Sequence, residues 1–319
     1  MYQTYDFAIV GGDKRQIYMA RKLLANGYSV ITYGLNLSDT DLSDIDISDS
    51  NISNMSIFGT SLDCSNVKGL TANDLTAKSL SDAIDSSKVI LTPIPLSKDK
   101  KTILSVTKEK DLTISNLMDL LKEDHILYGG CLSKELMEHC EHLGIYYEDF
   151  MEQEEVTLFN TIATAEGTLA EAIINSTINL HRSSCLVLGF GRCAKTLADK
   201  LKYLSDSVTI AARSNLALSE ANTSSFKVLP LDKLEEQISD YQFIFNTIPA
   251  LVLTENLLEG TSKDVLIIDI ASAPGGVDFP AAERLGRKAK LCLGLPGKYA
   301  PEASADFLTS YLLTSLGKK

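Results

Sequence analysis

The sequence predicts an α/β protein of two domains, with a doubly wound parallel sheet in its C-terminal half. The chain has 319 residues, of which 45% are hydrophobic and 23% are charged, enough for two ordinary globular cores. Short apolar stretches alternate with helical patterns along the C-terminal half, which is typical of parallel sheets. One of these stretches runs directly into the glycine-rich sequence GFGRCA at 189–194, which in turn opens a helical pattern.

Bulk properties exclude several classes of protein. The net charge of −12 argues against general nucleic-acid binding. There is no apolar run long enough for a membrane span, and the N-terminus carries no basic-then-apolar signal pattern. The six cysteines are scattered without a C-x-x-C pair, which argues for reduced thiols. We therefore expect a soluble cytoplasmic protein that binds neither nucleic acid nor membrane.

The N-terminal domain is expected to span 1–160, to be a flavodoxin-like α/β domain and to hold the substrate. Its first strand ends at Gly11-Gly12, and Asp13 is the expected N-cap of the helix that follows. Lys14 and Arg15 then fall in the first helical turn, where cations oppose the helix dipole. An anionic ligand would remove that conflict, and two exposed surface cations explain it equally well. Strands are predicted at 7–10, 29–33, 88–93, 125–128 and 145–147, and a helix at 133–143.

A segment rich in Ser, Asp and Asn, at 35–82, interrupts this domain. An apolar residue recurs there at every fifth position: Leu37, Leu42, Ile47, Ile52, Ile57, Leu62 and Val67. This spacing resembles the pentapeptide-repeat family, whose repeats wind into a β-helix with the central residue inside. Residues 73–75 and 78–80 could continue the repeat after a shift of register. We favour this pentapeptide-repeat-like insertion over a low-complexity loop with an accidental period.

The second domain is expected to span 161–302. A helix at 165–180 should cross into it from the first domain, and residues 303–319 should form a last helix that packs back on the first domain. Strands are predicted at 185–188, 208–212, 243–246, 265–270 and 290–293, with helices at 195–204 and 231–238 among them. This order is that of a Rossmann domain.

The sequence G-x-G-x-x-A at 189–194 predicts a phosphate loop. Gly189 would make the tight turn after the strand, and Gly191 would let a pyrophosphate approach the backbone. Ala194 would permit close packing of helix on strand, and the helix N-terminus would face the phosphates with free N–H groups. We infer that this domain binds a nicotinamide dinucleotide.

The residue after the second strand of this domain favours NADP over NAD. An acidic residue there would accept hydrogen bonds from the ribose of NAD, but the chain has Arg213 followed by Ser214. A guanidinium can pair with the 2′-phosphate of NADP, although a surface arginine at a strand end is the alternative. Arg192, in the loop, could cover the same phosphate or point to solvent.

Three further turns follow predicted strands, at 246–249, 269–276 and 294–298, where ligands bind in open α/β sheets. Turn chemistry alone would also explain their prolines and glycines. The candidate cofactor contacts in the first two turns are Asn246, Thr247, Pro249, Ala271 and Ser272.

Two polar groups flank the crossing helix. Thr164 and Glu166 precede it and could hold substrate, or could be an N-cap with early acidic residues. His181 closes the same helix. His139 and His142 share a helix face, but no carboxylate or thiol completes a metal shell beside them, so we expect no metal site.

Motifs along nearly the whole chain resemble the family of dipicolinate synthase A subunits. They are IVGGDKRQ (9–16), NTIATAEGTLAEAI (160–173), LHRS (180–183), LVLGFGR (186–192), AARS (211–214), NTIPA (246–250), IDIASAPGGVDF (268–279) and LGLPGKYAPE (293–302). The resemblance implies oxidation of dihydrodipicolinate, or of its hydroxylated precursor, to dipicolinate with hydride passed to NADP. It also implies a partner, the flavoprotein-like B subunit of dipicolinate synthase, and the mother-cell cytoplasm of sporulating bacteria, and we expect a homo-oligomer.

A ring dicarboxylate needs fixed cations and hydrogen-bond donors, for which Arg15, Thr164 and Lys298 are the candidates. Formation of the aromatic ring also needs a proton or water removed, so Glu166 and His181 are the candidate acid and base. Two other functions stay open: a dehydrogenase of another small carboxylate, and a dinucleotide-binding protein without catalysis of its own.

Overall fold

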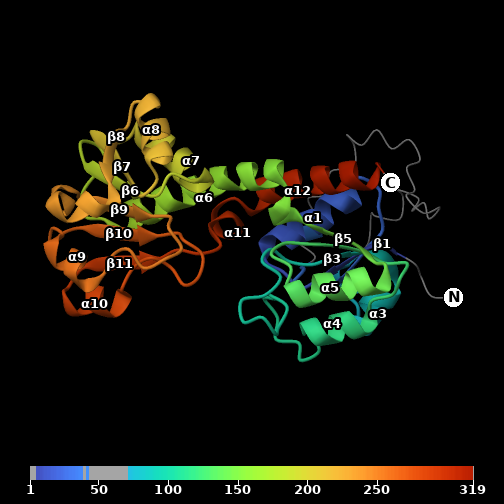
Figure 1. Ribbon diagram of the computed structural model, residues 1–319. Helices are drawn as coiled ribbons and strands as arrows, with labels where there is room; N and C mark the ends of the chain where they lie inside the picture. The colour runs from blue at the N-terminus through green and yellow to red at the C-terminus, as the bar shows by residue number, and fades with distance from the viewer. Residues whose placement is uncertain (1–4, 39–40, 43–70, 319) are drawn as a thin grey trace. The chain divides into compact units, whose positions relative to one another are not determined.

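The computed structural model describes residues 5–38, 41–42 and 71–318. The chain divides into two compact units (Figure 1). Unit 1 consists of Met1–Thr157 with Pro301–Lys319, and unit 2 is Leu158–Ala300. No helix in the described ranges is long and apolar enough to span a membrane.

Unit 1 is built on a parallel sheet with the strand order β2-β1-β3-β4-β5. The strand order reverses between β1 and β3, which makes that point the topological switch of a flavodoxin-like sheet. The strands are β1 (Tyr5–Val10), β2 (Val30–Tyr33), β3 (Ser87–Leu91), β4 (Ile126–Gly129) and β5 (Tyr146–Asp149).

Both faces of this sheet are covered, which is why β1 is continuously apolar from Phe7 to Val10. Phe7 and Ile9 of β1 join one core, and Ala8 and Val10 join the other, because successive side chains point to opposite faces. On the first face lie α1 (Lys14–Ala25) and α12 (Pro301–Leu316), which pack on each other, and the short η3 (Phe150–Glu152). On the other face lie α3 (Leu80–Asp85), α4 (Ile114–Leu120) and α5 (Lys134–Leu143).

Unit 2 has a parallel sheet with the order β11-β10-β9-β6-β7-β8. Counted from β6 as the first strand, this is the 3-2-1-4-5-6 order of a Rossmann sheet, with its switch point between β6 and β9. The strands are β6 (Ser184–Leu188), β7 (Ser207–Ala212), β8 (Lys227–Pro230), β9 (Phe243–Asn246), β10 (Leu266–Asp269) and β11 (Lys288–Leu291). The predicted fold class, a Rossmann sheet and a flavodoxin-like α/β sheet, is confirmed.

Helices cover both faces of this sheet as well. One core contains residues of α6 (Glu154–Asn175), α7 (Arg192–Leu201) and α8 (Asn215–Thr223), and α11 (Leu295–Tyr299) adds Leu295 to it. The other core contains residues of η4 (Leu231–Glu236), η5 (Ile238–Asp240), α9 (Glu255–Gly260) and α10 (Phe279–Arg284).

The predicted pentapeptide-repeat-like insertion falls mostly on residues 39–40 and 43–70, outside the described part of the chain. Its suggested continuation at 73–75 and 78–80 is wrong. Residues Ala72–Leu75 form the 3-10 helix η2, with a capping box between Thr71 and Asp74, and Leu80 opens α3 behind the N-cap Ser79. Local capping bonds therefore override a five-residue period there.

Helix limits also differ from the prediction. The crossing helix was expected at 165–180, but α6 begins at Glu154 and ends at Asn175. Residues 231–238, predicted as an α-helix, form the 3-10 helices η4 and η5. The edge strand β8 was missed because its exposed pattern shows only Leu229 buried.

Candidate dinucleotide site

Gly189 makes the turn after β6 in a backbone conformation that favours glycine, with φ at +93°. Its N–H donates to the Ala211 carbonyl of β7. A Cβ added at Gly189 would lie 2.6 Å from Thr247 Oγ1, in the turn after β9. Since β6 and β9 flank the switch point, glycine here lets the two loops close on each other at the carboxyl edge of the sheet.

Gly191 has a different role, because its φ of −79° suits any residue. A Cβ added at Gly191 would meet no atom within 4 Å, so the space in front of it is open. Gly191 is also the N-cap of α7, and no side chain caps that helix. The N–H groups of the first turn of α7 thus point to open space, an arrangement that binds phosphate.

Ala194 is completely buried, in the first turn of α7, against the core shared with β6. A larger side chain would push α7 off the sheet. The three small residues of the loop therefore fit the three separate needs of a pyrophosphate-binding turn.

The residues after β7 also fit a phosphate. Arg213 is exposed, and among the described residues its side chain has no hydrogen bond or ion pair. Ser214 is the N-cap of α8 and accepts from the Ala217 N–H at 3.4 Å. Arg192, the first residue of α7, is exposed as well. A guanidinium is thus available beside a second helix N-terminus at the same edge of the sheet.

A buried polar network holds the two neighbouring turns. Asn246 and Asp269, at the ends of β9 and β10, are both fully buried. Asn246 Nδ2 donates to Asp269 Oδ1 at 2.8 Å and to the Ile248 carbonyl at 3.0 Å. The Asp269 carboxylate accepts from the Ala271 N–H at 3.0 Å and from the Gly276 N–H at 2.8 Å.

This network changes the interpretation of Asn246. Its side chain is fully used inside the protein, so it positions the turns and its amide is not free for a cofactor. Thr247 is partly exposed and its hydroxyl donates to the Leu188 carbonyl at 2.8 Å. Pro249 and Ser272 are exposed at the same edge, whereas Ala271 is buried.

The structure places Thr164 and Glu166 inside α6, not in a loop before the helix. The Thr164 hydroxyl donates to the Asn160 carbonyl of its own helix at 2.8 Å. Glu166 is exposed and pairs with Lys200, near the C-terminal end of α7, at 2.9 Å. Because the phosphate loop lies at the other end of α7, Glu166 is about two turns of helix away from it.

His181 also lies away from the phosphate loop. It is exposed and lies three residues before β6, so it stands at the amino-terminal edge of the parallel sheet. It does not close the crossing helix, which ends at Asn175. A role as the general acid or base does not fit this position, because Rossmann sheets bind dinucleotides at the opposite, carboxyl edge.

Lys298 is not a free cation. Its Nζ donates to Glu171 Oε1 and lies 4.9 Å from the centroid of the Tyr299 ring. Glu171, on α6, is 3% exposed and also accepts from Lys290 Nζ and Tyr299 Oη, each at 2.8 Å. Burial alone would raise the pKa of Glu171, but the hydrogen bonds from these three partners hold it at about 2.

Arg15 is also committed within unit 1. Its side chain is 4% exposed and forms a fork on Asp13, with Nε at 3.0 Å and Nη2 at 2.8 Å from the carboxylate oxygens. Nη2 also donates to the Ile94 carbonyl. For Arg15 the expected conflict with the helix dipole is thus resolved by the N-cap itself, since Asp13 neutralises it, whereas Lys14 is an exposed cation.

No group of three or more His, Cys, Asp or Glu among the described residues could hold a metal ion. His139 Nε2 is bonded to the Met118 carbonyl at 2.9 Å. The five described cysteines are free thiols.

Comparison with known proteins gives one consistent result. Residues 6–58 and 56–151 match the family model of the N-terminal domain of the dipicolinate synthase A subunit. The A subunit of dipicolinate synthase from Bacillus subtilis (strain 168) is 27% identical over 315 residues, covering 96% of this chain and 93% of the relative. The crystal structure of the same subunit from Bacillus halodurans superimposes with a TM-score of 0.75, at 26% identity and 99% coverage of both chains.

Over nearly its whole length the chain is similar to dipicolinate synthase A subunits. A transhydrogenase from Sinorhizobium meliloti, at 12% identity and a TM-score of 0.62 over 96% of this chain and 92% of its own, shares the fold. The resemblance to dipicolinate synthase that the motifs indicate is therefore confirmed along both units.

The sequence did not mark Glu171 and Asp269 as organising residues of unit 2. Both are carboxylates whose importance comes from burial and from partners distant in sequence. Asp269 ends an apolar strand, a position that could have marked it. Glu171 sits on an ordinary helical pattern, and nothing local distinguishes it from a surface residue.

Proposed function

We propose that this chain is the NADP-dependent dehydrogenase that oxidises dihydrodipicolinate, or its hydroxylated precursor, to dipicolinate. The observation that carries the proposal is the open, uncapped N-terminus of α7 behind Gly191, at the switch point of a Rossmann sheet. The names of the full-length relatives supply the product.

The residues at the carboxyl edge of unit 2 fit a nicotinamide dinucleotide. Gly189, Gly191 and Ala194 would hold the pyrophosphate against the first turn of α7, and Arg213 with Ser214 would face the 2′-phosphate. Arg192, Thr247, Pro249, Ala271 and Ser272 lie in the loops of the same edge. When bound, such a cofactor accepts a hydride from the substrate.

The positive charge of Arg213 argues for NADP in particular, because the rest of the chain does not attract an extra phosphate. The chain has a net charge of −12, so a ligand with an extra phosphate meets an unfavourable background field. Arg213 is an exposed guanidinium with no carboxylate partner in the described chain. An unpaired cation at the place where NAD-binding domains carry an acidic residue supports NADP.

The proposal does not assign acid–base chemistry to His181, which lies at the wrong edge of the sheet, or to Glu166, which is paired with Lys200. Thr164 and Lys298 are engaged within unit 2, and Arg15 within unit 1. Arg15 and Lys298 remain candidates to hold a carboxylate, in which case the substrate must compete with Asp13 or Glu171 for them.

The experiment is a comparison of initial rates of NADP and NAD reduction by the purified chain, with dihydrodipicolinate generated in place. It is run with and without the B subunit of dipicolinate synthase, the partner that the name of the relatives implies. Lactate, alanine and other small 2-hydroxy and amino acids are tested in parallel.

We expect NADP reduction with the dihydrodipicolinate mixture and none with the other acids. Reduction with a 2-hydroxy or amino acid instead would assign a different dehydrogenase activity. Tight NADPH binding without turnover, whether or not the partner is present, would favour a dinucleotide-binding protein that is not itself the catalyst.

A further inference from the structure

Unit 1 has its own switch point, between β1 and β3, and the loop 92–113 after β3 lies there. Ligands of open α/β sheets bind outside the carboxyl ends of the strands at such a point. In this chain the position directly over β1 is already filled. The Gly12 N–H donates to the Leu104 carbonyl at 2.7 Å, and Gly12 forms a parallel bridge with Ser105.

The glycines at this turn are explained by that internal packing. A Cβ added at Gly11 would lie 2.6 Å from the Leu104 carbonyl oxygen and 2.8 Å from Ile103 Cγ2. The double glycine therefore admits the chain's own loop and does not mark a place where a ligand touches the β1 turn. Any ligand of this edge must bind on the outer side of the loop.

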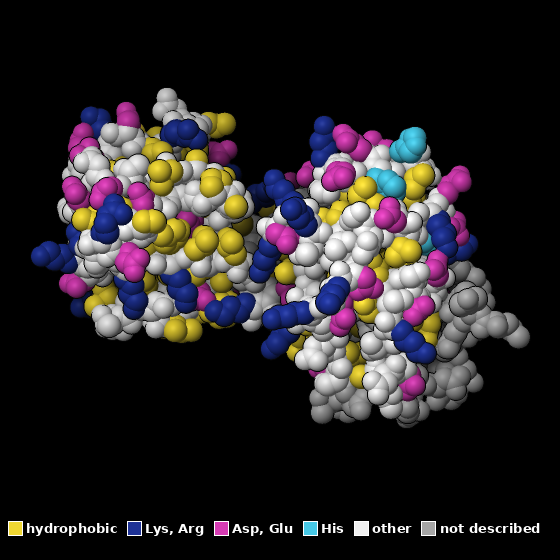
Figure 2. Space-filling model, turned by 90° about the horizontal axis from the view of Figure 1, so that it is seen from below, with side chains coloured by type: hydrophobic (Ala, Val, Ile, Leu, Met, Phe, Trp, Pro, Cys, Tyr) yellow, Lys and Arg dark blue, Asp and Glu magenta, His cyan; other side chains and the backbone are white. Residues whose placement is uncertain are grey.

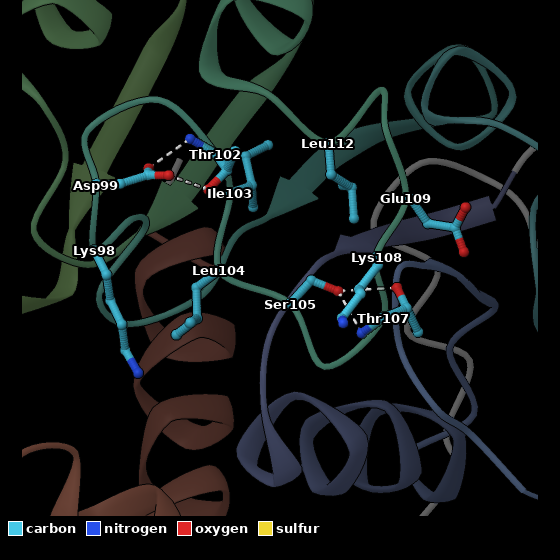
Figure 3. A pocket seen from close by; sticks show the side chains of 10 residues that line it. All are labelled: Lys98, Asp99, Thr102, Ile103, Leu104, Ser105, Thr107, Lys108, Glu109 and Leu112. Carbon is cyan, nitrogen blue, oxygen red and sulfur yellow. Dashed lines mark hydrogen bonds between the residues drawn. The ribbon is translucent and has the colours of Figure 1, made fainter.

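That outer side contains a pocket of about 400 Å³. Its apolar floor is formed by Ile103, Leu104 and Leu112. The polar lining consists of three hydroxyl residues, two lysines and two carboxylates: Thr102, Ser105, Thr107, Lys98, Lys108, Asp99 and Glu109. Figure 3 shows Lys98 on one side of the pocket and Lys108 on the other, with Leu104 and Ser105 between them.

Internal bonds fix the walls of this pocket. Ser105 Oγ donates to the Gly34 carbonyl at 2.6 Å and accepts from the Thr107 N–H at 2.9 Å. On the other side Asp99 accepts from the Thr102 N–H at 2.7 Å and the Lys101 N–H at 2.9 Å, and these bonds lower the pKa of Asp99. The pocket is thus anchored to the end of β2 and braced by a tight turn.

The two lysines of the pocket are not neutralised. Both are exposed, and among the described residues neither forms an ion pair or a hydrogen bond. Residues 98–110 carry five lysines and two acidic residues, in a chain whose net charge is −12. In Figure 2 Lys and Arg side chains gather along the margin of unit 1 where this loop lies.

We propose that the pocket lined by Lys98 and Lys108 binds a ring dicarboxylate, with the ring on the apolar floor and one carboxylate toward each lysine. The class of ligand rests on the proposed function, whose substrate and product are both ring dicarboxylates. The position at a switch point and the pair of unpaired cations across an apolar floor are observations of unit 1 alone. The hydroxyls of Thr102 and Ser105 donate within the loop, to Asp99 and to the Gly34 carbonyl, so the two lysines are the groups that hold the carboxylates.

The test is direct binding to the whole chain, by calorimetry in metal-free buffer and without any dinucleotide. The probes are pyridine-2,6-dicarboxylate, pyridine-2-carboxylate and inorganic phosphate. The variant is Lys98→Gln with Lys108→Gln. Its matched control is Lys100→Gln with Lys110→Gln, which removes the same charge from the same loop but from outside the pocket.

We expect the dicarboxylate to bind at least tenfold more tightly than the other two probes. The pocket variant should weaken it at least tenfold, and the control less than threefold. An equal loss in both variants, no loss in either, or phosphate binding as tight as that of the dicarboxylate would overturn the proposal. Because no cofactor is present, failure of NADP reduction would leave this result unaffected, and the two proposals fail separately.

Discussion

At the scale of single residues, the two glycines of the phosphate loop differ in what they do. Gly189 is required by its backbone angle and by Thr247 beside it, whereas Gly191 has an ordinary angle and open space. Gly189 is therefore required by the fold, whereas we propose that Gly191 is required by the ligand. The same substitution at the two positions should separate stability from binding.

Gly189→Ala should lower the melting temperature of the free chain by about 2–8 °C. An L-residue in the left-handed region costs about 1–2 kcal/mol, and the added methyl meets Thr247. Gly191→Ala should leave the melting temperature unchanged but weaken NADPH about tenfold or more, because its methyl stands where the pyrophosphate approaches. Thermal unfolding and NADPH fluorescence titration measure both effects, and undiminished NADPH affinity in Gly191→Ala would contradict the assignment.

Arg213 should decide between the two cofactors. Arg213→Ala is expected to weaken NADP binding about 10- to 100-fold, the value of charge-assisted hydrogen bonds, and to leave NAD binding within about twofold. Arg213→Lys is the control, since it keeps the charge but loses the planar fork. Its NADP affinity should lie between those of the parent chain and Arg213→Ala. Titration of both cofactors measures this, and equal losses for NADP and NAD would show that Arg213 does not read the 2′-phosphate.

Glu166→Gln should leave turnover within about twofold of the parent chain. The carboxylate is exposed and paired with Lys200, and such a surface pair contributes little. Steady-state rates with the preferred cofactor check this outcome. A loss of turnover of a hundredfold or more at unchanged stability would restore Glu166 as the acid or base that its sequence context indicates.

The residue types of the phosphate loop were predictable because each depends on local structure: the turn after β6, the approach of a pyrophosphate to the backbone, and the start of α7. Hydrogen-bond partners that are distant in sequence were not predictable. Nothing near Arg15 in the sequence shows that Ile94 accepts from it, and nothing near Lys298 points to Glu171. Arg15 pairs with its sequence neighbour Asp13, but its bond to Ile94 and the pairing of Lys298 with Glu171 arise only from the fold.

At the scale of elements, Glu171 joins three of them. It sits on α6 and accepts from Lys290 of β11 and from Lys298 and Tyr299 of α11. Its pKa of about 2 lies below the ordinary value of 4.5, so folding stabilises the ionised carboxylate relative to the protonated form. Its contribution to stability is complete above about pH 5 and is lost as pH falls toward 2.

Glu171→Gln should therefore destabilise the chain by about 1–3 kcal/mol at pH 7, and the difference from the parent should shrink between about pH 5 and pH 2. Urea unfolding across this range, with the exposed Glu166→Gln as the matched control, measures it. A difference that stays constant down to pH 2 would show that the paired carboxylate is not the source of the effect.

Element limits were less predictable than element types. The pattern at 165–180 correctly indicates a helix, but α6 starts eleven residues earlier, at Glu154. Its Gly167 faces α11, where an added Cβ would come within 2.8 Å of the Tyr299 ring. Packing against that neighbour, unknown from the sequence, explains a glycine that looks like a loop residue.

At the scale of the whole molecule, the two parallel sheets have the strand orders 2-1-3-4-5 and 3-2-1-4-5-6, each with one switch point. The alternation of apolar runs and helices predicted both as parallel sheets, because buried strands read as continuous hydrophobic segments. The motifs spread along both units then indicated the relationship to dipicolinate synthase, which the comparisons confirm. The sequence could not show which charged side chains remain unpaired at the carboxyl edges of the two sheets.

The most direct measurement is a single-turnover reaction of the purified chain, with the B subunit of dipicolinate synthase present, in which NADPH and dipicolinate are quantified from the same samples. The account predicts one NADPH formed for each dipicolinate, at the same rate, with Gly191→Ala slowing both together at subsaturating NADP. Dipicolinate formed without any NADPH or NADH, by a chain that binds the cofactor, would contradict it.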